Sequence, residues 1–230
     1  MLFYNAAQDK SRNMPIMKLA RSAPPVARLA IVLLLLFAAC TAAPRPQLTA
    51  TDSAEVDRVA AYLNSIPRFE AHFIQFGSFG PDAGVIRLDR PAGDMRIDYA
   101  GSEGRVIVIA NGQVQIVDQS NGSTTTMPVS RTPLGMLLTP TLNFSGAVTV
   151  TKLLKEPGII QITLEKTNHS SQGSLTLTLA DQPLGFIAVT VVDAHQRTLT
   201  MHLSNIDLAP TLTPSMFELR WTPSVGQETG

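Results

Sequence analysis

The sequence predicts a mainly β fold, a strongly curved antiparallel sheet or incompletely closed β-barrel with a few short helices. The chain is rich in Thr, Ser, Val, Ile and Leu, and such residues favour strands. From residue 69 onward side chains alternate with a period of two, and turn signals separate these segments at intervals of about 8–12 residues. One face of the sheet is apolar, with an N-terminal helix and a short lid helix to cover it. Such a face either packs solid or encloses a cavity for an apolar ligand, and both outcomes stay open.

The N-terminal part of the chain has the order of a secretory signal. Lys18, Arg21 and Arg28 precede an apolar run of eleven residues, 29–39, and small residues follow it. A membrane-spanning helix needs roughly 20 apolar residues, so this run is too short to be a stable anchor. We expect residues 1–43 to hold a cleaved signal peptide and the start of a linker, with translation starting at Met1, Met14 or Met17.

Two processing sites compete at the end of this signal. Residues 40–42 place small side chains where ordinary signal peptidase needs them, and cleavage there releases the protein into the periplasm. Residues 37–40 resemble a lipobox, although Phe37 stands where leucine is usual. Lipidation of Cys40 would anchor the protein in a membrane, facing the periplasm. We favour release, and anchoring through Cys40 remains the alternative.

Composition and motifs argue against several classes of function. The formal charge is zero, with 18 basic and 18 acidic residues, so no overall field attracts nucleic acid or anionic lipid. Cys40 is the only cysteine, so no intramolecular disulfide can form. The histidines show no metal-ligand spacing; they are His72, His169, His195 and His202. Without a nucleophile elbow, P-loop or dinucleotide fingerprint, we expect no enzyme, cofactor or metal. Hydrolysis by two distant carboxylates stays open as the enzymatic alternative.

The mature chain is expected to form one domain over residues 52–225, after a short spacer at 44–51. Its first element is a helix in which Asp52 caps the N-terminus and Glu55 completes a capping box. Apolar residues at helical spacing give the helix one buried stripe. The helix should end before Pro67, since proline disfavours helical geometry in the residue before it.

Strands are expected to follow, because Ala71, Phe73 and Gln75 alternate with His72, Ile74 and Phe76. The other expected strands of this half are 84–90, 95–100, 106–109 and 114–118, the last two joined by the Asn-Gly hairpin at 111–112. Residues 121–127 are expected to be a polar loop. Residues 132–138 form the short lid helix, with Thr132 as its cap and Pro133 in its first turn. The strands of the second half are expected at 148–154, 159–166, 174–179, 186–193, 198–205 and 217–221.

Seven short segments, in the right order, resemble the motifs of LolA-type outer-membrane lipoprotein carriers. They are AHFIQ at 71–75, GVIRLDRP at 84–91, MRIDY at 95–99, NG at 111–112, TPL at 132–134, VDAHQRT at 192–198 and FEL at 217–219. The resemblance runs from about residue 56 to residue 223. Met95 and Ile97 depart from the usual Phe and Trp, and Arg197 stands where the late hairpin normally carries glycine.

The resemblance implies an eleven-stranded, incompletely closed barrel with helices as a lid over an apolar cavity. The cavity would take up the acyl chains of lipoproteins released by an inner-membrane ABC transporter. A monomeric carrier without catalytic residues would then shield them across the periplasm and pass them to an outer-membrane acceptor. The alternative is a membrane-anchored lipoprotein receptor or lipid-sensing regulatory domain on the same scaffold, lipidated at Cys40.

The resemblance also implies site residues. In the family, the arginine of the R-P motif hydrogen-bonds lid backbone and holds the empty cavity closed, and Arg90 occupies that position here. The period-two pattern places Arg90 on the same face as Ile86 and Leu88, and a solvated charge at the strand end is the alternative. The candidates for lining the cavity are Phe73, Ile86, Leu88, Met95, Ile97, Tyr99, Leu134, Met136, Leu137 and Leu138. Met95, Met136, Leu137 and Leu138 are each equally compatible with an ordinary core position.

Overall fold

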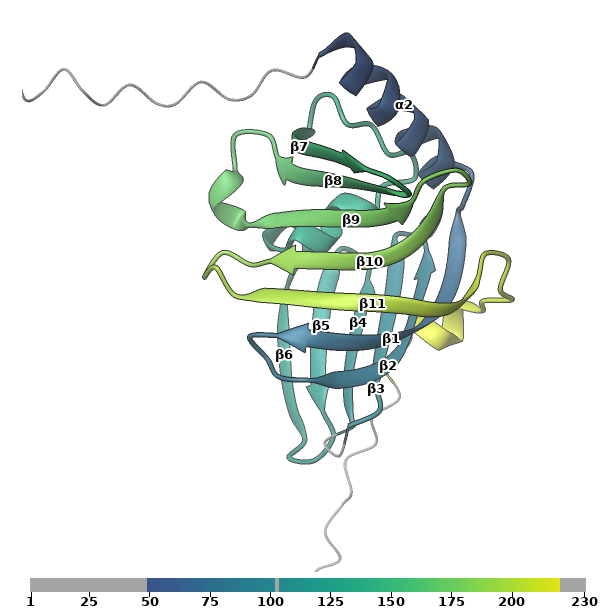
Figure 1. Cartoon of the computed structure of the whole chain (residues 1–230). Coiled ribbons are helices and arrows are strands. Elements are labelled where there is room, and N and C mark those ends of the chain that lie inside the picture. Colours follow the sequence, from purple (N-terminus) through teal and green to yellow (C-terminus); the bar gives the residue numbers. More distant parts are fainter. Residues whose placement is uncertain (1–48, 102–103, 220–230) are drawn as a thin grey trace, which may run out of the picture. The chain divides into compact units, whose positions relative to one another are not determined.

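The computed structural model describes residues 49–101 and 104–219, all within one compact unit. Eleven strands form a single antiparallel sheet in the order β6-β5-β4-β3-β2-β1-β11-β10-β9-β8-β7 (Figure 1). The sheet bends so that the strands of its two halves run in different directions in Figure 1. Because β6 and β7 are the two ends of this order and do not pair with each other, the sheet is not closed. The predicted mainly β architecture, an incompletely closed sheet, is confirmed.

The elements have the following bounds. The strands are β1 (Arg68–Gly77), β2 (Asp82–Asp89), β3 (Asp94–Tyr99), β4 (Arg105–Ala110), β5 (Gln113–Asp118), β6 (Ser123–Pro128), β7 (Val148–Glu156), β8 (Ile159–Lys166), β9 (Ser174–Ala180), β10 (Gly185–Val192) and β11 (Thr198–Asp207). The helices are α2 (Ala50–Asn64) and the short 3-10 helices η2 (Val129–Arg131), η3 (Pro133–Leu137), η4 (Ser170–Gln172) and η5 (Pro214–Phe217).

The N-cap of helix α2 lies three residues before the predicted cap, Asp52. Thr49 is the N-cap: its hydroxyl accepts from Asp52 N at 3.2 Å, and the Asp52 carboxylate accepts from Thr49 N at 2.9 Å. This is a capping box, but not the one expected between Asp52 and Glu55. Glu55 is engaged elsewhere, since Arg58 and Lys155 both donate to its carboxylate. The Lys155 contact, together with the Arg58–Asp181 ion pair, fastens α2 to the β7–β10 half of the sheet.

The inner face of the sheet follows the predicted alternation. In β1, Ala71, Phe73 and Gln75 are buried while the residues between them are exposed. A Cβ added to Gly84, on the neighbouring strand, would lie 2.0 Å from Asp98 O and 2.8 Å from the Phe73 ring. Glycine therefore leaves room for the Phe73 ring beside β2, where the ring meets Tyr99 edge to face at 5.4 Å between centroids.

The buried side chains form two clusters under the two halves of the sheet. One joins the apolar stripe of α2 (Val56, Val59 and Leu63) to the inner faces of β7–β10. The other is built on the inner faces of β1–β5 and includes Leu138 at the end of η3. Tyr62, Leu134 and Phe186 pack against both clusters, so the interior is continuous from one half to the other.

The lid helix forms with Thr132 at its N-cap position, as predicted, but the Thr132 side chain makes no capping hydrogen bond. Residues 133–137 are a 3-10 helix in which Pro133, Met136 and Leu137 are buried against β8, β9 and β10. The Thr132 hydroxyl does not cap this helix, because it donates instead to Val129 O at 3.1 Å.

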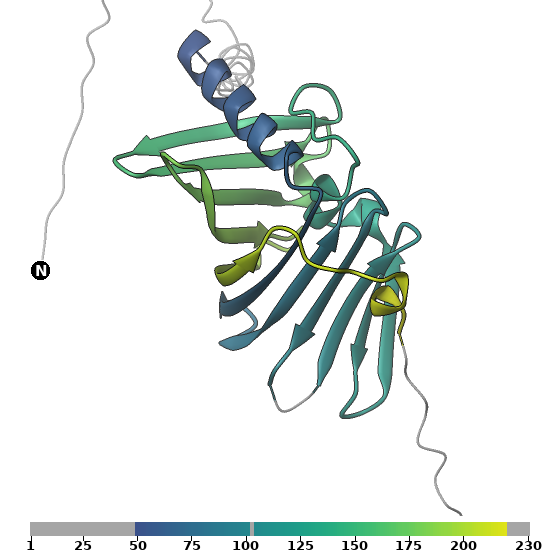
Figure 2. The ribbon, with the colours of Figure 1, turned by 90° about the vertical axis from the view of Figure 1, so that its right-hand side faces the viewer.

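Two sequence predictions of secondary structure are wrong. Most of the expected polar loop 121–127 belongs instead to edge strand β6 at 123–128, which pairs with all of β5. The first four residues of β6 are all exposed, so the segment shows no alternation of apolar and polar side chains. Threonine nevertheless favours strands, and backbone pairing requires no apolar side chain. The expected strand at 217–221 does not form over its described part, because Phe217 ends the 3-10 helix η5. Residues 208–219 cross the outside of the sheet (Figure 2), and η5, which ends at the buried Phe217, contacts β3 and β4.

Candidate functional site

Arg90 lies immediately after β2, and its side chain is almost completely buried, with a relative exposure of 2%. Its Nη1 donates to Leu63 O at 2.6 Å and its Nε to Leu137 O at 3.3 Å. Leu63 lies in the last turn of α2, and Leu137 is the last residue of η3. One cation therefore connects the end of β2 to both helices that cover the interior. The alternative of a solvated strand-end charge is wrong.

The environment of Arg90 explains how a buried charge is tolerated. Both acceptors are carbonyls at helix C-terminal ends, which carry partial negative charge, and Leu63 O also accepts from Ile66 N at 3.2 Å. Burial lowers the pKa of Arg90, because desolvation disfavours the charged form. An arginine side chain nevertheless stays protonated in proteins, so its N–H groups remain donors for these carbonyls.

The ten candidate lining side chains are brought together in the interior, where they are mostly packed as core. Six of them are buried in the cluster under β1–β5: Phe73, Ile86, Leu88, Met95, Ile97 and Leu138. Met136 and Leu137 belong to the cluster under β7–β10. Leu134 and Tyr99 are partly buried at the edges of these clusters. In the structure, these side chains fill the space between the sheet and the helices α2 and η3.

An open space remains at the opposite end of the strands from η3. This inner cavity has a volume of about 300 Å³ and is lined by Gln75, Phe79, Tyr99, Arg105, Ile107, Ile116 and Leu199. The residues come from five strands and from the β1–β2 turn, so the cavity exists only in the folded sheet. Of the ten candidates, Tyr99 is the one that lines it.

The inner cavity has an apolar wall with a few polar groups. Gln75 has a relative exposure of 1%, and its Oε1 has no hydrogen-bond partner among the described residues. Its Nε2 donates to Gly80 O over a long 3.4 Å. Burial is the main cause that raises the pKa of Tyr99 to about 12, so the phenol is neutral at physiological pH. The Arg105 guanidinium carbon lies 5.7 Å from the centroid of the Tyr99 ring, a cation–π distance.

An aromatic side chain stands at the rim of this cavity. Phe79, in the β1–β2 turn, is 49% exposed, and the guanidinium carbon of Arg197 lies 4.8 Å from its ring centroid. Arg197 is itself paired with Asp193 at 2.7 Å. Ser78 N donates to Thr198 O at 2.8 Å, which joins the same turn to the start of β11. The arginine that replaces the usual hairpin glycine thus contacts the ring at the cavity rim.

Sequence reasoning singled out neither Gln75 nor Arg105 as a site residue. Gln75 belongs to the AHFIQ motif and to the predicted inner face of its strand. A polar side chain on an apolar face could have identified it as a candidate site residue. Arg105 precedes the predicted strand 106–109 and carried no such signal. Its place beside Tyr99 results from the pairing of β3 with β4.

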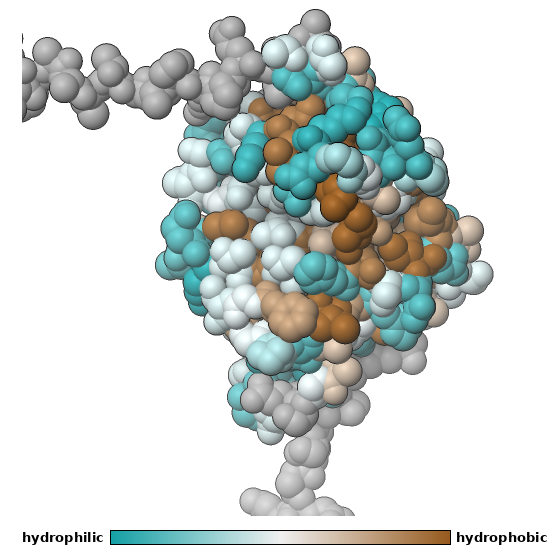
Figure 3. All heavy atoms as spheres, viewed as in Figure 1, coloured by the Kyte–Doolittle hydropathy of each residue, from teal (hydrophilic) through white to brown (hydrophobic). Residues whose placement is uncertain are grey.

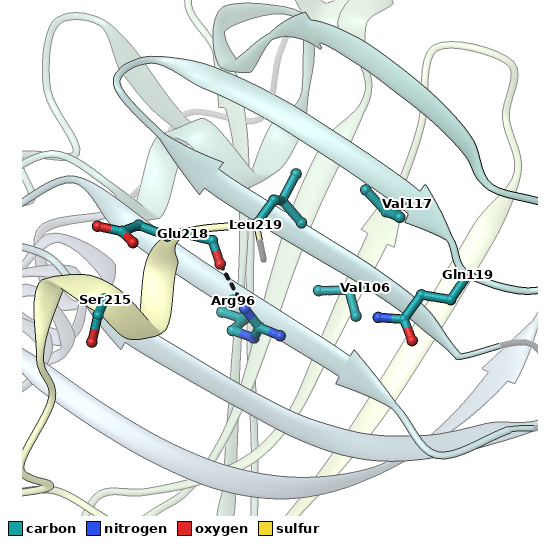
Figure 4. A pocket seen from close by; sticks show the side chains of 7 residues that line it. All are labelled: Arg96, Val106, Val117, Gln119, Ser215, Glu218 and Leu219. Atoms are coloured by element: carbon teal, nitrogen blue, oxygen red, sulfur yellow. Dashed lines mark hydrogen bonds between the residues drawn. The ribbon is translucent and has the colours of Figure 1, made fainter. Parts of the chain in front are cut away.

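A second, smaller hollow lies on the outer face and holds the C-terminal segment. It measures about 110 Å³, and its lining includes Arg96, Val106 and Val117 from the sheet and Leu219 from the segment that follows η5 (Figure 4). The Arg96 Nη1 donates to Met216 O at 3.1 Å and to Glu218 O at 3.2 Å. These bonds fasten the segment over apolar side chains of β4 and β5, so we regard this hollow as a structural contact.

Within residues 49–101 and 104–219, no group of three or more His, Cys, Asp or Glu side chains is placed to hold a metal ion. In the same part of the chain, no helix has the length and apolar character needed to cross a membrane. Cys40 and the apolar run 29–39 lie outside the described residues.

The family comparison bears directly on this geometry. A family model described as "Outer membrane lipoprotein carrier protein LolA" matches residues 64–220, more than half of the chain. This chain belongs to the LolA family. The match spans Arg90, the lid helix and every residue of the inner cavity. No curated protein matches the sequence significantly.

Several solved structures are similar to this LolA-family chain at low sequence identity. An uncharacterized conserved protein from Thermus thermophilus is 11% identical, with a TM-score of 0.45 over 75% of this chain and 96% of that one. The MucA/MucB complex of Pseudomonas aeruginosa matches with 12% identity and a TM-score of 0.37, over 73% and 60%. The Mycobacterium tuberculosis lipoprotein LppX matches with 8% identity and a TM-score of 0.38, over 72% and 100%. Because these TM-scores are below 0.5, the similarities say nothing about ligand or partner.

Proposed function

We propose that this LolA-family protein is a periplasmic carrier that shields the acyl chains of lipoproteins on their way from the inner to the outer membrane. The observation that carries the proposal is the buried cation Arg90, which connects the sheet to both covering helices over a continuous apolar interior. No catalytic residue is part of it. In this role Arg90 is the latch of the lid, and the ten candidate side chains line the acyl-chain site once the lid separates from the sheet.

The energetics favour such a device. Burying an acyl chain of about 16 carbons removes apolar surface worth roughly 0.8 kcal/mol per CH₂, or about 13 kcal/mol in total. Hydrogen bonds to a charged group contribute about 1.5–3 kcal/mol each. One acyl chain can therefore displace a latch of two hydrogen bonds, while the latch still closes the empty interior. Methionines 95 and 136 have flexible, polarizable side chains that can repack around a chain.

The inner cavity is too small for a triacylated lipoprotein anchor as it stands. Its volume of about 300 Å³ is at the lower end of small-molecule pockets, which run from roughly 300 to 1,000 Å³. Uptake of several chains therefore requires α2 and η3 to move away from the inner faces of the strands. The carrier works as a monomer in this proposal, and the leader at 1–43 delivers it to the periplasm.

The partners in this proposal are an inner-membrane ABC transporter that releases lipoproteins and an outer-membrane acceptor. Apolar side chains suited to such transient contacts are exposed on the outer face of β1, where Ile74 and Phe76 have relative exposures of 53% and 52%. Figure 3 shows apolar atoms exposed over the middle of the face on which β1 and β11 lie in Figure 1.

The direct test uses the purified mature protein and one acylated lipoprotein, compared with its non-acylated counterpart in which serine replaces the lipidated cysteine. We expect a soluble one-to-one complex with the acylated form alone. A protein that holds neither the acylated lipoprotein nor a hydrophobic probe is not a carrier.

The lipobox-like residues 37–40 favour one second candidate, a membrane-anchored receptor or lipid-sensing domain on the same scaffold. Metabolic labelling with palmitate separates the two. A carrier released by signal peptidase takes up no label, whereas an anchored protein is labelled and loses the label in Cys40→Ser.

A further inference from the structure

The polar groups of the inner cavity are not explained by shielding acyl chains alone. A methylene chain placed against Gln75 would leave its buried Oε1 without a hydrogen bond, an arrangement that disfavours binding. The other wall residues, Ile107, Ile116 and Leu199, offer apolar surface for such a chain. The cavity thus presents a polar and an apolar part, as a site for an amphiphile does.

The orientation of the Gln75 amide determines what it can bind. Its Nε2 faces Gly80 O at 3.4 Å, and the reversed orientation would bring two carbonyl oxygens together. The group left over is therefore the Oε1 acceptor. Only a ligand atom that carries an N–H or O–H can satisfy it.

The second polar group of the cavity is a donor. Arg105 has five N–H groups in a planar array, and its guanidinium lies over the Tyr99 ring. A ligand carbonyl or carboxylate oxygen can accept from it. Beside its apolar wall and the Tyr99 phenol, the cavity therefore offers the Gln75 acceptor and a cationic donor.

We propose that the inner cavity is a subsite for an amide-linked acyl chain, with the amide N–H donating to Gln75 Oε1 and the amide carbonyl accepting from Arg105. A secondary amide carries one donor and one acceptor on adjacent atoms, the complement of these two side chains. The first methylenes of the chain lie against Ile107, Ile116 and Leu199, beneath the Phe79 ring. This inference rests on the proposed carrier function and adds a preference to it. An ester-linked chain has the same carbonyl but no N–H, so it leaves Gln75 unsatisfied.

The test uses a matched pair of soluble single-chain ligands, N-(2-hydroxyethyl)dodecanamide and 2-hydroxyethyl dodecanoate. They differ only in the N–H or O that follows the carbonyl. Dissociation constants come from calorimetry or from displacement of a fluorescent probe on the wild-type protein. We expect the amide to bind about tenfold more tightly than the ester. The N-methylated amide, which has no N–H, should bind like the ester.

Three variants test which side chain causes the preference for the amide. In Gln75→Leu the amide and the ester should bind alike, because the acceptor is gone. Arg105→Leu should weaken both ligands, because both have the carbonyl. Gln113→Leu, the same change at an exposed position of β5, should leave the tenfold preference intact.

The outcomes separate this inference from the function on which it rests. If amide, ester and N-methyl amide bind the wild-type protein equally, as when a water molecule satisfies Gln75, the subsite is overturned and the carrier function stands. A preference that persists in Gln75→Leu overturns it too. If none of the ligands binds, the carrier proposal itself fails. The ligand series on the wild-type protein decides the matter even where Gln75→Leu does not fold.

Discussion

Replacement of Arg90 by leucine tests whether two hydrogen bonds hold the empty interior closed. Leucine keeps an apolar side chain at the buried position but removes the donors to Leu63 O and Leu137 O. Charge-assisted hydrogen bonds contribute about 1.5–3 kcal/mol each, and the loss is partly offset because the buried cation no longer needs to be desolvated. We therefore expect the closed, empty form to lose about 3 kcal/mol, which lowers its Tm by roughly 6–12 °C for a domain of this size.

The same substitution should strengthen ligand binding. If the loaded form has the lid displaced, it does not contain these hydrogen bonds, and only the empty form is destabilised. A penalty of about 3 kcal/mol on the empty form then appears as roughly 100-fold tighter binding. A lipoprotein carrier with this change should load readily and release poorly.

The measurement combines thermal unfolding of the empty protein with equilibrium binding of a hydrophobic fluorescent probe. Arg131→Leu is the matched control, because Arg131 is an exposed arginine in η2, next to the lid helix. It should change neither quantity appreciably. A lower Tm with unchanged affinity for Arg90→Leu would show that the loaded form keeps the two bonds. No change in either measurement would refute the latch.

Three further substitutions test other parts of the reasoning. Gly84→Ala places a methyl group 2.0 Å from Asp98 O, so we expect at least about 3 kcal/mol of destabilisation in denaturant unfolding; a stable variant would contradict the tight approach at this position. Arg197→Gly removes the cation over Phe79, so a hydrophobic probe should leave the inner cavity faster, while the Tm should change by only about 2–4 °C. An unchanged release rate would mean that Phe79 does not limit the exit of a ligand from the cavity. Hydrogen bonds from Lys155, and then from Arg58, lower the pKa of Glu55. Its contribution to stability is therefore present above the unfolded pKa of about 4.3 and is lost as the pH falls through the lower folded value. The acid-induced fall in Tm should accordingly be smaller in Glu55→Gln than in the wild-type protein, and an equal fall in both would exclude this contribution.

Much of the sheet was readable from local patterns. Inward residues such as Phe73 and Ile86 were identified because alternate side chains of a strand point to opposite faces, and that rule needs no knowledge of neighbouring strands. The same rule did not identify strand β6. Its threonines are exposed on both faces, and its strand conformation depends on the hydrogen bonds that β5 supplies. The cap of α2 was misplaced for a comparable reason, since Glu55 satisfies the local capping pattern but is drawn away by Lys155 from a strand 100 residues later.

For the candidate site too, some features follow from local sequence and others only from the tertiary structure. The sequence by itself determined the period-two strands, the amphipathic α2, the short apolar lid helix and the order of motifs that marks the LolA family, because each depends on residues close together in the chain. Only the tertiary structure decided what Arg90 binds, since its acceptors lie 27 and 47 residues away at the ends of two helices. It also decided that Gln75 and Arg105 share one cavity, because five strands must pair in register before these side chains meet. Hydrogen bonding and burial of this kind depend on distances in the folded chain, and local sequence patterns do not contain them.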